Sequence, residues 1–152
     1  MVGQLGEKLA SREKNIISHE GFFRVDNEKV RGVPLFYGSI FVDPICARIV
    51  YLETLPLVCT ADKTSDMLFA VNAVNNKLRF GKFYLTPARI FEDGKVNRVI
   101  YENSLSCASG EITDDDTDFI IDESMSSLRK YSVGLLRIID GSVTAEEFVN
   151  AI

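Results

Sequence analysis

The sequence predicts an α+β fold in which helices pack against a largely antiparallel sheet. Apolar residues recur with the helical period over residues 4–19, 63–78 and 114–139, and runs typical of strands lie between these segments. The connections within each run of strands are too short for helical crossovers, which favours antiparallel pairing. The 152 residues, of which 46% are hydrophobic and 26% charged, suit one domain spanning residues 1–152, because two domains would leave each too little core.

Residues 4–19 predict the first helix. Leu5, Leu9 and Ile16 fall on one stripe, which is typical of a helix that buries one face. Gly21 is suited to end this helix, and His19 would lie in its last turn, where a cation interacts favourably with the helix dipole. The single His of the chain is therefore expected at the surface or in a cap rather than in a catalytic site.

Four segments rich in aromatic and β-branched residues then predict strands at residues 22–25, 35–42, 45–52 and 55–59. The turn formers Asn27, the stretch 32–34 and the pair 43–44 separate them. Because Pro56 has no N–H group, the last segment is expected to lie at a sheet edge or to be broken there.

Residues 63–78 predict the second helix, with Asp62 or Thr64 as its N-cap. Its apolar stripe consists of Met67, Val71, Val74 and Leu78. The asparagines at 72, 75 and 76 are poor helix formers, so we expect their amides to bond something specific or the helix to fray at this end.

Strands are predicted again at residues 81–85, 88–91 and 96–105, with a turn at 92–95. In the first of them, Lys82 and Tyr84 alternate with Phe83 and Leu85, so the second pair is expected to face the core. In the last, Val99, Tyr101 and Leu105 fall on one face and Arg98 and Glu102 on the other.

The final segment predicts a long helix that Thr113 caps, with three aspartates in its first turn. Its core-facing stripe consists of Ile121, Met125, Leu128, Ser132, Leu135 and Ile139. Gly141 ends this helix, and Thr144 with Glu147 fits a capping box that opens a short terminal helix.

The charge and composition of the chain disfavour several classes of function. A net charge of −5 and a pI of about 4.9 disfavour strong, non-specific binding to nucleic acid or to an anionic membrane. The polar first residues lack the apolar stretch of a signal peptide, and no apolar run is long enough to cross a bilayer, so we expect a cytoplasmic protein without membrane contact. The chain has an odd number of cysteines, and each lies beside apolar residues: Cys46, Cys59 and Cys107. This pattern predicts reduced, buried, inert thiols.

A short motif lies where the second helix meets the next strand. Asn72 and Asn75 near the helix end are followed, after a short gap, by Gly81, Lys82 and Phe83 at the start of the strand. In this pattern the chain resembles the YbjN-type proteins, a family described as candidate bacterial sensory transduction regulators. By fold, these are grouped with the chaperones of type III secretion systems. The likeness covers roughly residues 60–152, and the motif is structural rather than catalytic.

The resemblance implies an α-β-β-β-α-β-β-α order, a secretion-chaperone-like fold, frequent dimerisation, a cytoplasmic location and no known catalytic activity. Secretion chaperones bind an extended segment of another protein along their surface. The resemblance therefore implies a protein or peptide segment as partner and a homodimer as the assembly. It implies no cofactor.

Two charged stretches stand out. Seven acids and no base lie between Glu111 and Glu123, a pattern typical of a solvated, capped helix start, although a cation site or a docking patch for a basic partner fits it as well. Residues 77–98 hold six bases, two acids and interleaved aromatic residues. We take Arg79, Lys82, Tyr84 and Arg98 from this stretch as candidate partner-binding residues, which serve either a protein or a nucleic acid.

No catalytic arrangement appears in the sequence. It has no phosphate-binding glycine loop, no close spacing of zinc ligands, and no cysteine nucleophile with a His nearby. The sequence therefore predicts a non-enzymatic protein-binding adaptor or regulator, without catalytic, metal or cofactor sites. The alternative is a nucleic-acid-binding regulator that uses residues 77–98.

Overall fold

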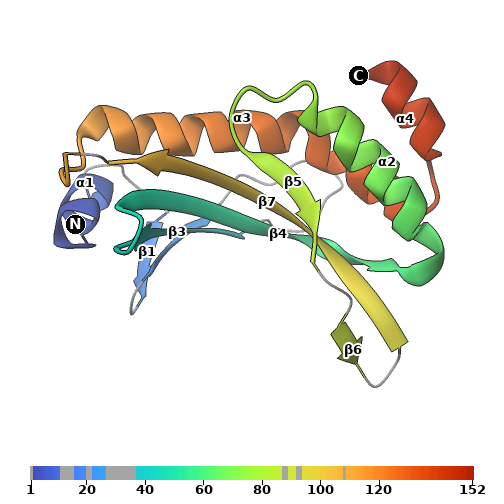
Figure 1. Cartoon of the computed structure of the whole chain (residues 1–152), viewed down its shortest axis with the longest axis horizontal. Helices are drawn as coiled ribbons and strands as arrows, with labels where there is room; N and C mark the ends of the chain where they lie inside the picture. The colour runs from blue at the N-terminus through green and yellow to red at the C-terminus, as the bar shows by residue number, and fades with distance from the viewer. Residues whose placement is uncertain are drawn as a thin grey trace.

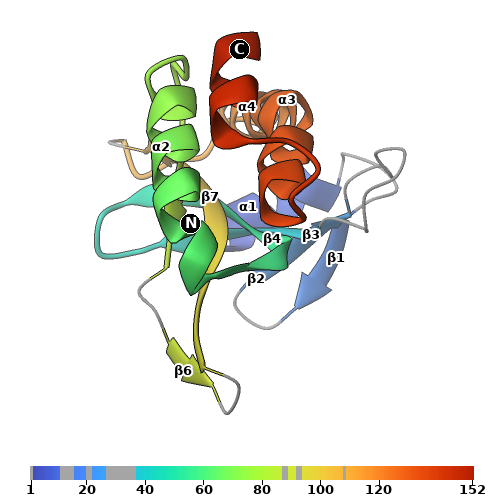
Figure 2. The same cartoon turned by 90° about the vertical axis from the view of Figure 1, so that its right-hand side faces the viewer.

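An antiparallel sheet carries a layer of helices on one face in the computed structural model of the chain (Figures 1 and 2). The structure describes residues 2–10, 16–19, 22–26, 37–86, 89–91, 94–107 and 109–152. Their elements are, in chain order, α1 (Val2–Ala10), β1 (Ile16–His19), β2 (Phe22–Asp26), β3 (Tyr37–Asp43), β4 (Arg48–Thr60), a 3-10 turn η1 (Ala61–Lys63), α2 (Thr64–Asn75), β5 (Lys82–Leu85), β6 (Arg89–Phe91), β7 (Gly94–Ser106), α3 (Asp114–Ile139) and α4 (Ala145–Ala151).

The sheet has the strand order β1-β2-β3-β4-β7-β5, and β6 also pairs with β7. All of these pairs are antiparallel. The two longest strands, β4 and β7, pair at the centre from Arg48 opposite Ser106 to Thr60 opposite Val96. Just under half of β4, from Arg48 to Glu53, also pairs with β3, and β5 lies at the edge beyond β7.

Alternation along the strands separates a buried face from an exposed one. Phe83, Val99 and Tyr101 point into the core and are at most 1% exposed, whereas Lys82 and Arg98, one residue away, are exposed. The Phe83 and Tyr101 rings lie 4.9 Å apart between centroids, so the sheet and helix layers meet on packed aromatic rings. This is the pattern that the sequence predicted for β5 and β7.

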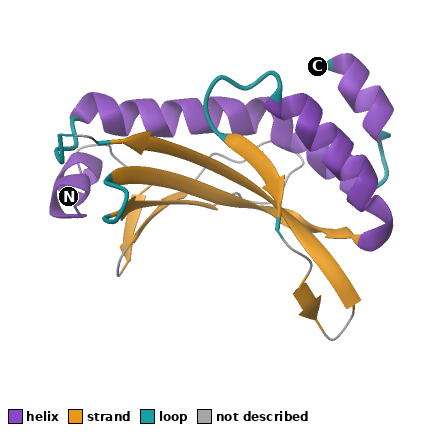
Figure 3. Cartoon of the chain, in the orientation of Figure 1, coloured by secondary structure: helices purple, strands orange, loops and turns teal. Residues whose placement is uncertain are grey.

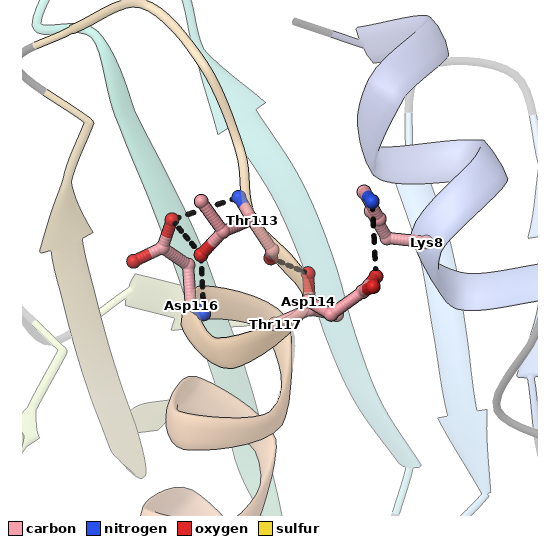
Figure 4. Close-up of polar contacts among 5 residues, drawn as sticks. All are labelled: Lys8, Thr113, Asp114, Asp116 and Thr117. Atoms are coloured by element: carbon pink, nitrogen blue, oxygen red, sulfur yellow. Dashed lines mark hydrogen bonds and ion pairs between the residues drawn. The ribbon is translucent and has the colours of Figure 1, made fainter.

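The helix α3 crosses the sheet from end to end (Figure 1). Its N-terminus forms a capping box, in which the Thr113 side chain accepts a hydrogen bond from the Asp116 N–H and the Asp116 carboxylate accepts from the Thr113 N–H (Figure 4). Asp114 in the same turn pairs with Lys8 of α1 at 3.1 Å, which ties the two helices together. The caps predicted at Thr113 and Thr144 are both confirmed.

The first helix is shorter than predicted. It ends at Ala10, and Ile16–His19 form strand β1, which pairs with β2 so that Ile16 lies opposite Val25. The predicted helix over residues 4–19 was therefore wrong at Ile16–His19, because two consecutive β-branched residues favour a strand once a partner strand is available. His19 lies in β1 rather than in a helix turn, and Gly21 lies outside the described residues.

Residues 45–52 and 55–59, predicted as two strands, belong largely to one strand, β4. Ile45 instead lies in the turn between β3 and β4, because the Asp43 carboxylate accepts hydrogen bonds from the Ile45 and Cys46 N–H groups. The β4–β7 register shifts between Thr54 and Val58, around Pro56. The break expected at that proline is thus confirmed.

The predicted α+β class, an antiparallel sheet packed by helices, is confirmed. The described elements exceed the order α-β-β-β-α-β-β-α by a strand in each half and by the terminal helix α4. The second helix ends at Asn75 rather than at residue 78. None of the helices in the described ranges combines the length and apolarity that crossing a membrane requires.

Candidate functional site

The motif asparagine Asn75 occupies the free edge of the sheet. Its side-chain amide donates to the Phe83 carbonyl and accepts from the Phe83 N–H, both at 2.8 Å. A single side chain thus satisfies the two backbone groups of β5 that point away from β7. The amide takes the place of a further strand, which joins the end of α2 to the edge and leaves Phe83 unable to pair with another chain.

The other motif residues have separate positions. Gly81 has a φ of +72°, and a Cβ atom there would overlap the Tyr101 hydroxyl, so this position requires glycine. Phe83 fills the core at 1% exposed. Asn72 is an exposed residue of α2. Three of the four motif residues therefore have a structural explanation around β5.

Three of the four candidate partner-binding residues lie on one face of the sheet. Lys82 and Tyr84 alternate with the core residues of β5, and Arg98 does so in β7. Arg79 lies instead in the connection between α2 and β5, which runs on the helix side of the sheet (Figures 1 and 3). The structure thus groups Lys82, Tyr84 and Arg98 and separates Arg79 from them.

We call the face opposite α2 and α3 the outer face. The pairing register places on it, beside the three candidate residues, Leu52, Thr54, Ile100 and Glu102. Lys82 lies opposite Glu102, and Tyr84 lies opposite Ile100. Tyr84, Ile100, Leu52 and Thr54 are half-buried, and no helix in the described part of the chain covers them.

Polar contacts order the centre of the outer face. The Tyr84 hydroxyl donates to the Glu102 carboxylate at 3.1 Å, and the Lys82 ammonium lies 5.6 Å from the centroid of the Tyr84 ring. Burial of the Tyr84 ring, together with the negative charge of Glu102, raises the pKa of its hydroxyl. The Tyr84 ring is therefore held in place by its hydrogen bond to Glu102, and the Lys82 ammonium lies beside it.

The outer face carries two exposed cations, Lys82 and Arg98. Lys82 and Arg98 have no ion-pair partner among the residues that the structure describes, and both are exposed. At the other end of the face, by contrast, Arg48 donates to the Asp43 carboxylate at 3.0 Å. Lys82 and Arg98 thus flank Tyr84 and Ile100, and Glu102 is the acidic residue opposite Lys82.

The ion pair between Asp43 and Arg48 can be tested by titration. The Arg48 guanidinium and then the Cys46 N–H hold the pKa of Asp43 below its ordinary value. Any stability that the lowered pKa of Asp43 contributes is fully present when the pH is above the pKa of Asp43 in the unfolded chain. It is lost as the pH falls through the lower pKa of Asp43 in the folded protein. In the Arg48→Gln variant, NMR titration of the Asp43 carboxyl carbon should show its pKa moving back up.

The control for this titration is Glu147 at the start of α4. Its pKa is lowered by hydrogen bonds from the Thr144 N–H and side chain, far from Arg48 in the sequence. Glu147 should titrate at the same pH in both proteins. An unchanged Asp43 titration in the variant would contradict the assignment of the shift to Arg48.

The three thiols differ in their exposure. Burial raises the pKa of Cys59 and of Cys107, which makes both unreactive, as expected. Cys46 is exposed, so its predicted burial was wrong: the hydrogen bond that its N–H donates to Asp43 holds it in a surface turn. Within the described ranges, no three His, Cys, Asp or Glu side chains gather as metal ligands.

Sequence analysis missed the apolar part of the outer face. The sequence pattern placed Glu102 on the same side of its strand as Arg98. Ile100 lies two residues from each, so the same alternation places it on that side too. Leu52 and Thr54 could not be assigned to this face, because that required the register of β4 against β7, whose partners are far apart in the sequence.

Comparisons with known proteins bear on the fold. No family model matches the chain, and no curated protein matches it. Among solved structures, the chain is similar to the crystal structure of YbjN from E. coli, which is described as a candidate transcription regulator. The match has a TM-score of 0.66 and 12% sequence identity, and it covers 95% of each chain. The chain therefore has the YbjN-like fold that its motif predicted.

Proposed function

We propose that this protein is a non-enzymatic adaptor or regulator that binds an extended segment of another protein on its outer face. In this proposal residues 1–152 form one cytoplasmic domain, which works as a homodimer. The observation that carries the proposal is the pair of cations Lys82 and Arg98, which flank the half-buried Tyr84 and Ile100 and have no ion-pair partner among the described residues. The similarity in fold to a candidate transcription regulator is compatible with a regulator rather than an enzyme.

The chemistry of the outer face defines the partner segment. Apolar side chains on an extended segment would cover Tyr84, Ile100 and Leu52, and a carboxylate would pair with Lys82 or Arg98. We therefore propose an extended segment in which acidic and apolar residues take turns at every second position, since only every second side chain of an extended chain points to the same side.

Nucleic acid is the second candidate, because Lys82, Tyr84 and Arg98 share one face. Glu102 disfavours it: its carboxylate lies directly opposite Lys82 in the register and accepts the hydrogen bond of Tyr84. A phosphate backbone that crossed this face would meet that negative charge, whereas a polypeptide can place an apolar or basic group there.

Synthetic peptides test the proposal directly. Peptides in which Glu and Leu take turns at every second position, with Ser between them, should bind the protein, and the same peptides with Lys in place of Glu should not. The Lys82→Glu and Arg98→Glu variants should each weaken the binding about tenfold, because a favourable charge contact becomes a repulsive one. Fluorescence anisotropy over a range of salt concentrations would measure this, and the affinity should fall with salt.

The matched control is Lys130→Glu, which makes the same charge change on the exposed side of α3. This variant should bind the acidic peptides nearly as the wild type does. Equal losses in Lys130→Glu and Lys82→Glu would contradict a site on the outer face. The same assay should be done with labelled single-stranded oligonucleotides. The nucleic-acid function would be favoured if the protein binds these but no peptide, and if Lys82→Glu abolishes the binding.

A further inference from the structure

The two cations of the outer face lie at different levels along the strands. The register places Lys82 beside Glu102 at one level, and it places Tyr84 beside Ile100 at the next level of the same face. Arg98 lies one level further, two residues from Ile100 in β7. The line that joins the two cations therefore runs along the strands rather than across them.

The spacing of the two cations follows from the geometry of the sheet. Arg98 lies four residues before Glu102, the residue opposite Lys82. Four residues of an antiparallel strand span about 14 Å, and the step to the neighbouring strand adds only about 5 Å sideways. The backbones of the two cations are thus about 14 Å apart, a distance that an extended polypeptide covers in about four residue steps.

The surface between the two cations is apolar. Tyr84 and Ile100 are half-buried and lie at the level midway between Lys82 and Arg98. A residue two steps from either end of the bound segment would lie on them, because only every second side chain of an extended chain points to the same side. The outer face thus matches a segment in which an apolar residue lies midway between two acids.

The two cations differ in their surroundings. Lys82 lies opposite the acidic Glu102. Arg98 has uncharged residues opposite it on both sides, Val58 in β4 and Thr86 just beyond β5. Thr86 also fixes the Arg98 backbone, because its N–H donates to the Arg98 carbonyl and its hydroxyl accepts from the Arg98 N–H, both at 2.9 Å. A carboxylate bound at Lys82 would meet the repulsion of Glu102, whereas one bound at Arg98 would meet no acid directly opposite.

We propose that one extended segment of a partner protein lies along β5 and β7 and contacts both cations at once, through two acidic residues about four positions apart with an apolar residue midway. The inference rests on the proposed function of the outer face, to which it adds the direction, spacing and length of the segment. Arg98 makes the stronger acid contact, since its guanidinium can bind a carboxylate through two hydrogen bonds. Glu102 weakens the contact at Lys82 and so limits the affinity.

Two isomeric peptides test the spacing. Both have blocked, uncharged ends and glycine-rich flanks; the core is Glu-Ser-Leu-Ser-Glu in the first and Glu-Ser-Leu-Glu-Ser in the second. The composition is the same, but the second Glu of the second peptide points away from the sheet. The first peptide should bind about tenfold more tightly, because it alone makes both charge contacts. Fluorescence anisotropy measures both affinities.

Variants of the two cations show whether both contacts form and in which direction the peptide lies. Arg98→Gln and Lys82→Gln each remove one cation and keep a polar side chain of similar length. The difference between the isomers should disappear in the variant that lacks the cation facing the second Glu, and it should persist in the other variant. A difference that persists in both variants would overturn the contact with two cations.

Glu102 provides a test in which binding should improve. A glutamine at this position can still accept the hydrogen bond of the Tyr84 hydroxyl, but it has no charge. Glu102→Gln should therefore bind the first peptide about threefold more tightly than the wild type, whereas loss of a merely structural residue would weaken binding. The control is Glu146→Gln, which makes the same change at an exposed position of α4, on the helix side of the sheet (Figure 1). This control should leave the affinity unchanged, and an equal gain in both variants would overturn the role of Glu102.

The possible results separate this inference from the proposed function. Tighter binding of the first isomer, lost in one cation variant and enhanced in Glu102→Gln, supports a segment that contacts both cations. Equal binding of the two isomers, which Arg98→Glu still weakens, overturns the spacing and leaves the outer face as a peptide-binding surface. Binding of neither isomer overturns the spacing and the proposed function together.

Discussion

Gly81→Ala should destabilise the protein by about 3 kcal/mol. An alanine at a φ of +72° costs about 1–2 kcal/mol, because its Cβ atom approaches the backbone in this left-handed conformation. The added Cβ atom would also overlap the Tyr101 hydroxyl and lie 2.7 Å from the Cζ atom of that ring. Tyr101 is fully buried against Phe83, so its ring has little room to move. Chemical denaturation would measure the loss as a lower midpoint with an unchanged slope.

Gly110 provides the matched control for this substitution. Its φ of +74° is nearly the same, but a Cβ atom there would meet no atom within 4 Å. Gly110→Ala should therefore cost only the backbone contribution of about 1 kcal/mol. The double variant Gly81→Ala/Tyr101→Phe, which removes the overlapping hydroxyl, should recover part of the difference. Equal losses at the two glycines would show that the contact with Tyr101 contributes nothing.

Asn75→Ala should destabilise the protein by about 2 kcal/mol and expose the edge of the sheet. The substitution removes both hydrogen bonds between the side-chain amide and Phe83, and each is worth about 1 kcal/mol. The freed N–H and C=O groups of β5 are then available to another strand, so we also expect the variant to aggregate more readily. Thermal unfolding measures the first effect, and light scattering at a fixed protein concentration measures the second.

Asn76→Ala is the control for this second variant. It makes the same chemical change at the adjacent asparagine, whose side chain is exposed. Because Asn76 is the C-cap just after the last residue of α2, its replacement leaves both bonds between Asn75 and Phe83 in place, and the comparison isolates those bonds. Asn76→Ala should change the stability by no more than about 0.5 kcal/mol. If the two variants lose the same stability, the Asn75 amide is not what holds α2 to the sheet.

Local patterns predicted the parts of the fold whose structure is decided locally. The caps at Thr113 and Thr144 depend on hydrogen bonds three residues apart, and the alternation of Phe83 with Lys82 depends only on neighbours in one strand. The stripe of α3 was equally clear, because 26 residues repeat its period many times. The same motif that suggested the family also placed Asn75 and Gly81 at positions that the structure explains.

The errors arose where a distant partner decides the structure. Ile16 fits a helical stripe, and it forms a strand because β2 is beside it. The residues around Pro56 continue one long strand because β7 pairs on both sides of the break. The outer face, likewise, depends on a register between residues of β4 and β7 that no local pattern contains. Arg79 was grouped with Lys82 by sequence proximity, and a turn of the backbone separates them.

The central pairing of β4 with β7 has a consequence for how the chain is made. Its partners lie between 36 and 58 residues apart along the sequence. A ribosome therefore completes β3 and β4 well before β7 exists, and for that interval one side of β4 is an unpaired edge. Pairings this distant are closed late and slowly, because the entropy of ordering the intervening loop must be lost first. The newly made chain is thus most vulnerable to misassociation between the synthesis of its fourth strand and that of its seventh.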